Sequence, residues 1–491
     1  MIKRITFTLF LTIVTLSLQA QNTDQRDSIV SLNPVCEFIT TPNGGEVNLN
    51  QHIANHRQMA PVWDGSGSES TSILAKGISL SKKGLGFSGY AGYKRGKRLN
   101  TAWSNVAAAP EYYPYLVADS IGGDYRHERY LLGGAFQMQH NSHRGAIRID
   151  YDGSVHWRST DPRPKNTVSN MGLTLGYMHH ASFGLIGAAL SLENRKQHAD
   201  IRIEEDKRKD RFYQLLGMGL FDHRYSTVES SFSRYYRGMG MKAEISFAQQ
   251  ISKGWYARIQ FENSRMDVEE SDTRISAFSK RTGFASSMGY QLNTSENFRW
   301  DNRLEISCRK LKGFEQVYKI EQSNAQTGVF VPVLLDKSQR TVIQQPEITL
   351  RSMLHLTGKQ ILRSAGLHAG WSGYEETYNP YAMKCTALKA GGSYKLTFPL
   401  KKQSFEIRGQ HDMLLNLSKS LHTPEANRIV EEMIRPNFRY FTRSALYNEL
   451  KFSYHHRLKH VSLTPSVKLQ GEFTTDNRKA LALTVGFKIN M

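Results

Sequence analysis

The last twelve residues of the chain, Ala480 to Met491, show the most regular pattern in the sequence. Every second residue is apolar, and the residues between them are small or polar. Side chains of an extended strand point alternately to its two faces. The pattern therefore predicts a strand with one wholly apolar face. The apolar positions are Leu481, Leu483, Val485, Phe487, Ile489 and Met491.

The same stretch resembles the β-signal that ends outer-membrane β-barrel proteins of Gram-negative bacteria. That signal has a polar residue, a glycine two positions later, and then two hydrophobic residues separated by one. Thr484, Gly486, Ile489 and Met491 occupy those positions. Met491 departs from the family pattern, in which the last residue is usually aromatic. The resemblance implies an outer-membrane protein whose final strand is recognised by the barrel-assembly machinery.

The first residues have the parts of a secretory signal peptide. Lys3 and Arg4 form a charged start, an apolar run extends from Ile5 to Leu18, and Ala20 is a suitable cleavage residue. The apolar run is shorter than the about 20 residues that a membrane-spanning helix needs. We therefore predict that residues 1–20 are a cleaved signal peptide and that the mature chain is exported.

The formal net charge is +20. In a cytosolic protein such an excess of Lys and Arg would suggest a nucleic-acid partner. An exported chain meets other polyanions, namely lipopolysaccharide phosphates and anionic lipids, and the sequence has no nucleic-acid motif. We expect contact with outer-membrane lipid and lipopolysaccharide, and no nucleic-acid partner.

We predict no cofactor and no resident metal. Cys36, Cys308 and Cys385 are too few and too widely spaced for a disulfide framework or a zinc site. A metal site needs three or four converging ligands. Whether the paired histidines bind a metal is left open by the sequence. These histidines are His52, His56, His140, His143, His179, His180, His455, His456 and His460.

From Leu85 onward, segments of alternating polarity repeat along the chain. Between Ile147 and Tyr151, for example, apolar residues alternate with Arg148 and Asp150. Tight turns and longer polar stretches separate these segments in turn, as in barrels with short periplasmic turns and long extracellular loops. We predict an all-β fold, a transmembrane antiparallel up-and-down β-barrel of about 16 strands, with a range of roughly 14 to 18. The longer stretches include residues 95–128, 196–238, 311–339 and 418–439.

Residues 21–84 lack a sustained period and are interrupted by Pro34, Pro42 and Pro61. This composition predicts irregular structure ahead of the barrel. We assign residues 21–84 to a periplasmic extension or a plug-like segment, and residues 85–491 to the barrel. The sequence does not decide whether the segment enters the lumen.

The predicted inner wall carries charged side chains of both signs. A charged, water-filled passage would use them to select ions or solutes. They could equally form cross-strand ion pairs that only keep the wall polar and in register. The lumen-lining candidates are Arg148, Asp150, Arg258, Glu262, Arg303, Glu305, Arg309, Glu406, Arg408, Lys451 and Lys468.

The function we expect is a channel, or an accessory of transport, that passes small solutes across the outer membrane. Its partner would be a small solute or an importer complex. A scaffold or adhesion barrel acting through its outer loops is the alternative. A rim-sited hydrolase is a weaker one, because Ser142 stands between His140 and His143 without the motif of outer-membrane phospholipases. We therefore do not expect an enzyme. The solute and the oligomeric state are left open.

Overall fold

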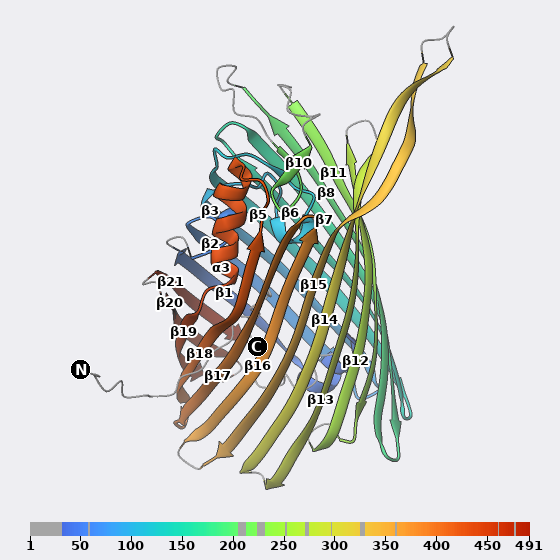
Figure 1. Cartoon of the computed structure of the whole chain (residues 1–491). Helices are drawn as coiled ribbons and strands as arrows, with labels where there is room; N and C mark the ends of the chain where they lie inside the picture. The colour runs from blue at the N-terminus through green and yellow to red at the C-terminus, as the bar shows by residue number, and fades with distance from the viewer. Residues whose placement is uncertain are drawn as a thin grey trace, which may run out of the picture.

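The structure is a computed structural model that describes residues 32–56, 59–204, 213–222, 231–250, 253–270, 274–295, 297–324, 329–358, 361–459, 461–475 and 478–491. The predicted signal peptide, residues 1–20, lies outside these ranges. Within them, 18 strands form one sheet that closes on itself (Figure 1). No helix in the described ranges is both long and apolar enough to cross a membrane.

Each barrel strand pairs antiparallel with the next one along the chain, and β1 pairs with β21 to close the sheet. The prediction of an all-β, antiparallel, closed barrel is thus confirmed, with 18 strands in place of about 16. The strands are β1 (Gly44–Asn55), β2 (Gly67–Leu80), β3 (Leu85–Thr101), β5 (Gly123–His140), β6 (His143–Arg158), β7 (Arg163–Ala181), β8 (Gly184–Arg202), β11 (Ser231–Ala248), β12 (Gly254–Glu270), β13 (Ile275–Ser295), β14 (Phe298–Asn324), β15 (Val329–Thr357), β16 (Leu362–Tyr378), β17 (Tyr381–Pro399), β18 (Gln403–His422), β19 (Ala445–Arg457), β20 (Ser462–Thr474) and β21 (Lys479–Asn490).

The two additional strands, β1 and β2, lie in the segment that the sequence assigned to an extension. They pair along their whole length, and β2 continues the sheet into β3. The barrel therefore begins at Gly44 and not near Leu85. The alternation of β1 is hard to recognise because Gln51 stands in the row of Val47, Leu49 and Ile53.

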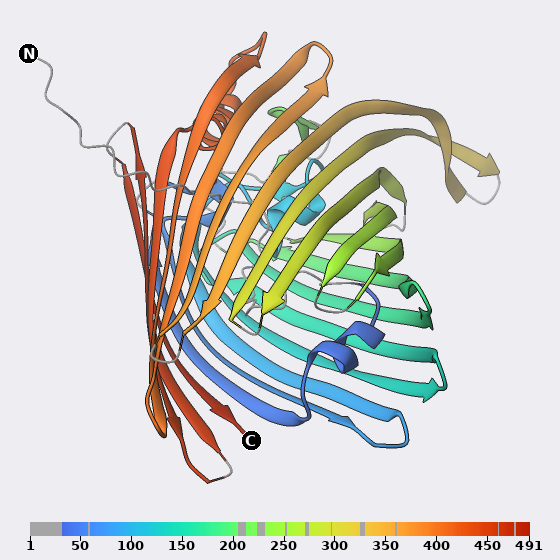
Figure 2. The same cartoon turned by 90° about the horizontal axis from the view of Figure 1, so that it is seen from below.

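A short segment before β1 lies inside the barrel at its periplasmic end, where Figure 2 shows the helix α1 (Val35–Thr40) within the opening. The Asn33 side-chain amide donates to the carbonyls of Tyr177 and Ala188 at 2.8 and 3.1 Å. Glu37 forms an ion pair with Arg148 of β6. These contacts fix the segment to the inner wall of β6, β7 and β8.

The outer face carries exposed apolar side chains at alternate positions. Ile149 is 55% exposed, Ile259 53% and Leu481 59%. A lipid-facing band of this kind is the mark of a transmembrane barrel. The protein is thus an outer-membrane β-barrel, as the sequence predicted.

Several stretches predicted as loops are strand instead. Within the predicted loop 311–339, residues 311–324 belong to β14 and residues 329–339 to β15, and together they form a hairpin that projects beyond the rest of the barrel (Figure 1). Only residues 379–380 connect β16 to β17. These strands were missed because, outside the membrane, water contacts both of their faces and no alternation of polar and apolar residues is imposed on them.

Candidate functional site

The extracellular mouth is occupied by loops that fold inward. We define the loop cap as the described connections between β1 and β2, β3 and β5, β8 and β11, and β18 and β19, namely residues 59–66, 102–122, 213–222 and 423–444. Its regular elements are η2 (Val62–Asp64), α2 (Ala109–Tyr112), β4 (Val117–Ala118), β9 (Tyr213–Gly217), β10 (Leu220–Asp222), η4 (Val430–Ile434) and α3 (Arg435–Phe441). The strands β10, β9 and β4 form a small sheet of their own.

The loop cap has a hydrophobic core that joins its four connections to the barrel wall. Burying a large apolar side chain stabilises a fold by about 1.5–3 kcal/mol. The cap is therefore a packed unit and not a fringe of separate loops. The buried members include Trp63, Trp103, Tyr112, Leu116, Leu215, Ile429 and Met433 from the cap, and Tyr236, Val268 and Ala277 from the wall.

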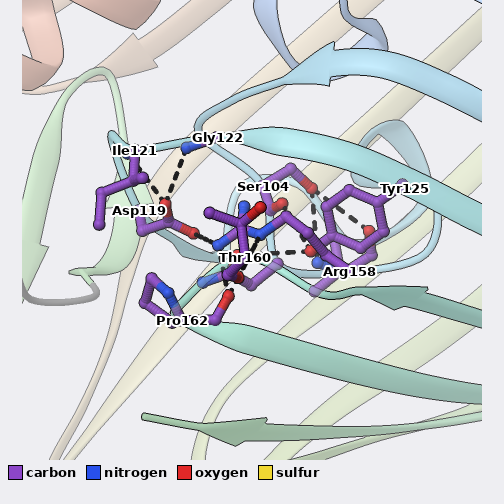
Figure 3. A network of polar contacts seen from close by, with 10 residues as sticks. Ser104, Asp119, Ile121, Gly122, Tyr125, Arg158, Thr160 and Pro162 are labelled. Atoms are coloured by element: carbon purple, nitrogen blue, oxygen red, sulfur yellow. Dashed lines mark hydrogen bonds and ion pairs between the residues drawn. The ribbon is translucent and has the colours of Figure 1, made fainter. Parts of the chain in front are cut away.

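A buried ion pair attaches the β3–β5 connection to β6 (Figure 3). The guanidinium of Arg158 donates to the carboxylate of Asp119 at 2.7 Å, and the two side chains are 0% and 1% exposed. The other carboxylate oxygen of Asp119 accepts the backbone N–H groups of Ile121 and Gly122 at 2.9 and 3.1 Å. Arg158 also donates to the carbonyl of Pro162 at 2.6 Å. Both charges thus have several partners, which buried charges require.

Tyr125 of β5 extends this network into the cap. Its hydroxyl donates to the carbonyl of Ser104 at 3.2 Å. The guanidinium of Arg158 lies over its ring, 5.5 Å from the centroid, in a cation–π arrangement. The β3–β5 connection is therefore attached to the barrel near both of its ends, at Ser104 and at Asp119.

Two further polar contacts attach the cap to other strands of the wall. Arg234 of β11 pairs with Glu270 of β12 at 2.7 Å, both nearly fully buried, and Arg234 also donates to Gln214 of the cap. The Tyr113 hydroxyl donates to the buried carboxylate of Glu376 at 2.5 Å. Burial and the neighbouring carboxylate raise the pKa of Tyr113 well above its ordinary value, which keeps the hydroxyl protonated and able to donate.

A cavity of about 290 Å³ remains between the loop cap and the wall. Leu215 and Phe221 of the cap line one side, and Glu270, Ser276 and Tyr318 of the strands line the other. The loop cap thus occupies most of the mouth and leaves this cavity beside the wall.

The predicted lumen residues occupy the positions opposite to the lipid-facing side chains. Besides the ion pair of Arg148 with Glu37, Asp150 accepts the hydroxyl of Tyr90 at 2.7 Å. Glu305 lies between Arg303 at 3.3 Å and Arg351 at 3.1 Å. Of these ion pairs, Glu305–Arg351 joins two strands, β14 and β15, whereas Arg303–Glu305 lies within β14 and Arg148–Glu37 joins β6 to α1.

The remaining candidates divide into paired and unpaired groups. Glu406 pairs with Arg408 at 2.5 Å, and Lys468 lies 3.7 Å from Glu449. Lys451 stands opposite both Arg408 and Lys468 in the sheet.

Arg258, Glu262 and Arg309 have no ion-pair partner within 4 Å among the described residues. Glu262 and Arg309 stand on either side of Gly283, and Arg258 lines a cavity beside α1. Whether these eleven residues select a solute stays a prediction.

The predicted assembly signal lies in the strand that closes the barrel. The Thr484 hydroxyl is hydrogen-bonded to His52 of β1 at 2.9 Å. A Cβ atom on Gly486 would lie only 2.7 Å from the side-chain oxygen of Asn50. Ile489 pairs with β1 and β20, and the Met491 N–H donates to Gly45 at 2.8 Å. Recognition of this strand by the assembly machinery stays a prediction.

His143 of β6 and His179 of β7 are directly opposite each other, and their rings stack with centroids 4.5 Å apart. In the described part of the chain, however, no group of three His, Cys, Asp or Glu residues could hold a metal. His460 lies outside the described residues. His143 hydrogen-bonds to Tyr177 at 2.6 Å, while the backbone carbonyl of Ser142 accepts the His180 N–H at 2.8 Å. These contacts give the hydrolase alternative no support.

The loop cap itself was not predicted. Residues 95–128 were assigned to a polar outer loop, although Trp103 and the run Tyr112 to Leu116 make its centre apolar and aromatic. That apolar content was the available signal for a folded loop. Its polar partners, such as Arg158 and Glu376, are distant in the sequence and could not be assigned to it.

Three solved structures resemble the chain at low sequence identity. A mutant of the ferric enterobactin receptor PfeA from Pseudomonas aeruginosa is 9% identical with a TM-score of 0.38, over 92% of this chain and 81% of that one. The FrpB iron transporter from Neisseria meningitidis is 9% identical with a TM-score of 0.38, over 92% and 82%. The siderophore receptor PirA from Acinetobacter baumannii is 8% identical with a TM-score of 0.37, over 91% and 81%.

A comparison with curated proteins finds no match. Residues 37–489 match a protein family described as a family of unknown function, DUF6850. This match covers nearly all of the barrel, from α1 to the last strand. The chain therefore belongs to the DUF6850 family.

Proposed function

We propose that the protein is a gated channel for small solutes in the outer membrane, and that the loop cap is its extracellular gate. The observation that carries the proposal is a packed cap over a barrel whose inner wall is charged. Barrels of about 16–18 strands are wide enough to leave an aqueous channel. A barrel that served only as an anchor would have no need of such a lumen.

Water reaches the inner wall below the cap. The side chains of Arg129 and Arg351 retain 43% and 42% of their exposure although both point inward. Charged groups in a dry interior would instead be fully desolvated. This supports a wet passage that is interrupted at its outer end.

The loop cap is attached to the wall at several separate places. Besides Asp119–Arg158, Gln214–Arg234 and Tyr113–Glu376, Tyr236 of β11 donates to the carbonyl of Tyr115, and Thr341 of β15 donates to the carbonyl of Leu216. Loss of one attachment would weaken the closed state without breaking the barrel, whose strands are hydrogen-bonded independently. At the periplasmic end, α1 and Asn33 form a second, smaller restriction.

A flux measurement tests this proposal. Residues 103–118 are replaced by a short Gly/Ser linker, and release of a small fluorescent anion from proteoliposomes is recorded. The control shortens the β14–β15 hairpin, which is also extracellular but stands outside the mouth (Figure 1). We expect rapid release only from the variant without residues 103–118, which supply Trp103, Tyr112 and Leu116 to the core of the cap. Equal, negligible release from both variants would refute the channel.

The projecting hairpin favours a second candidate function, a surface contact. Val333, Leu334 and Leu335 near its outer end are exposed apolar residues, which on an extracellular arm can serve a protein partner. If the hairpin variant abolishes attachment of whole cells to a surface or to each other while flux is unchanged, the barrel acts as a scaffold.

A further inference from the structure

A row of basic side chains crosses three neighbouring strands on the outer surface of the barrel. Arg265 of β12 is directly opposite Lys280 of β13, and Lys280 is directly opposite Lys312 of β14. Lys310 lies two residues from Lys312 on the same face of β14. Because neighbouring strands are about 4.8 Å apart, these four cations form one compact group. We call them the basic row.

The basic row faces the membrane and not the lumen. Side chains of one strand face share the same parity. Arg265 has the parity of Phe261, and Lys280 that of Phe284, both of which are exposed apolar residues of the outer band. Lys310 and Lys312 have the parity of Ile306, which is 40% exposed on the same band.

The basic row stands at the outer edge of the apolar band. On β14 the band runs from Trp300 through Ile306, and ten residues separate Trp300 from Lys310. A tilted strand climbs roughly 2.5 Å per residue, so this distance is about 25 Å, the height of the apolar band of outer-membrane barrels. The four cations are therefore level with the lipid headgroups of the outer leaflet.

The row lacks enough acidic partners within the protein. Arg265 pairs with Asp267 at 2.7 Å. Lys280, Lys310 and Lys312 have no ion pair within 4 Å among the described residues. Like charges directly opposite each other destabilise a sheet, so an external anion would relieve repulsion as well as gain attraction.

We propose that the basic row binds a phosphate group of lipopolysaccharide in the outer leaflet. Lys and Arg side chains donate charge-assisted hydrogen bonds to phosphate oxygens. Above the row, the rings of Phe278 and Phe314 stack with centroids 4.7 Å apart. Phe278 itself is buried, because the guanidinium of Arg265 lies over its ring, 4.3 Å from the centroid. Below it, Phe261 and Phe284 continue the surface along which acyl chains would lie. The basic row would bind this phosphate whether or not the barrel is a channel.

The test uses the mature protein, purified in a neutral detergent, and two probes, bisphosphorylated lipid A and its phosphate-free form. Binding is measured by native mass spectrometry. Each Lys near an anionic lipid surface contributes about 1 kcal/mol. The variant Lys280→Gln/Lys310→Gln/Lys312→Gln should therefore bind bisphosphorylated lipid A roughly 100-fold more weakly than the wild type.

The matched control is Lys82→Gln/Lys83→Gln/Lys401→Gln, which removes the same charge from periplasmic turns and should bind as the wild type does. The variant Lys280→Arg/Lys310→Arg/Lys312→Arg keeps the charges and should retain binding of bisphosphorylated lipid A. If the Gln variant fails to fold, the two lipids are compared on the wild type, where the phosphate-free form should bind at least about tenfold more weakly. Equal binding of the two lipids, or equal losses in the row and control variants, would overturn the proposal.

Discussion

The guanidinium of Arg158 lies 2.7 Å from the carboxylate of Asp119, and neither side chain is accessible to solvent. One residue belongs to a barrel strand and the other to the loop cap, so this pair joins the mobile part of the proposed gate to its frame. In a buried pair each charge depends on the other, because an isolated charge in the interior is strongly disfavoured.

Replacing Asp119 alone should loosen the cap. The variant Asp119→Ala leaves the Arg158 charge buried without its partner, which costs about 3–5 kcal/mol. When protease is added to intact cells that express this variant, we expect it to cleave the protein within residues 102–122. The wild-type protein should resist cleavage. The double variant Asp119→Leu/Arg158→Met removes both charges and should recover most of the resistance.

The control for this experiment is Arg428→Gln, which breaks an exposed pair with Glu432 on the cap. Such surface pairs contribute at most about 1 kcal/mol. If Arg428→Gln opened the cap as much as Asp119→Ala, burial of the Asp119–Arg158 pair would not be what holds it.

Removing one hydroxyl should also weaken the closed state. Tyr113→Phe deletes the hydrogen bond to the buried Glu376 carboxylate, which then retains the bond from Tyr374 at 2.8 Å. Burial raises the pKa of Glu376 to about 7, so this carboxyl is partly protonated at neutral pH. A hydrogen bond contributes about 0.5–1.5 kcal/mol between neutral groups and about 1.5–3 kcal/mol when one partner is charged. Amide hydrogen exchange in residues 109–118 should become roughly tenfold faster or more. Tyr130→Phe removes an exposed hydrogen bond to Glu128 and should leave this exchange rate unchanged.

Strand β16 should tolerate no side chain at one position. In Gly370→Ala, the new Cβ would lie 2.6 Å from the backbone carbonyl oxygen of Ile348 on the neighbouring strand β15, which cannot turn away as a side chain can. Overpacking of this kind costs about 1–3 kcal/mol. We expect less folded barrel in the outer membrane, read from gel mobility without boiling. At Gly392 a Cβ would find ordinary contacts of 3.6 and 3.7 Å, so Gly392→Ala should fold normally.

Ion selectivity should depend on the inner arginines that lack ion pairs. In the variant that lacks residues 103–118, the further change Arg258→Gln/Arg309→Gln should lower the ratio of anion to cation permeability by about twofold or more. The measurement is the reversal potential in a salt gradient. Lys280→Gln/Lys312→Gln removes the same charge from the membrane-facing side of the wall. These side chains lie outside the lumen, so this variant should change the ratio little. An unchanged permeability ratio in the Arg258→Gln/Arg309→Gln variant would show that these two residues are structural parts of the wall and do not select ions.

The barrel could be predicted from the sequence because its signal is local. The alternation from Ala480 to Met491 needs only neighbouring residues to be recognised, and it recurs strand by strand. Where one polar residue interrupted that alternation, as Gln51 does in β1, the strand was missed. Long strands outside the membrane were missed as well, because water on both sides imposes no alternation on them.

The loop cap could not be predicted in the same way because its contacts are not local. Tyr113 and Glu376 are 263 positions apart in the sequence, and only the closed barrel brings them together. The aromatic residues of the β3–β5 connection indicate that something is buried there, but not against which strand. The charges of the inner wall were identifiable individually, whereas their division into paired and unpaired groups depends on the register of the strands.

The most direct test of the account is the single-channel conductance of the purified protein in a planar bilayer, with and without residues 103–118. If the loop cap is the gate, the wild type should show few and brief openings, and the variant without residues 103–118 should show long-lived conductance steps. A variant that is folded and inserted but remains silent would contradict this gating role, because the lumen would then be closed below the cap.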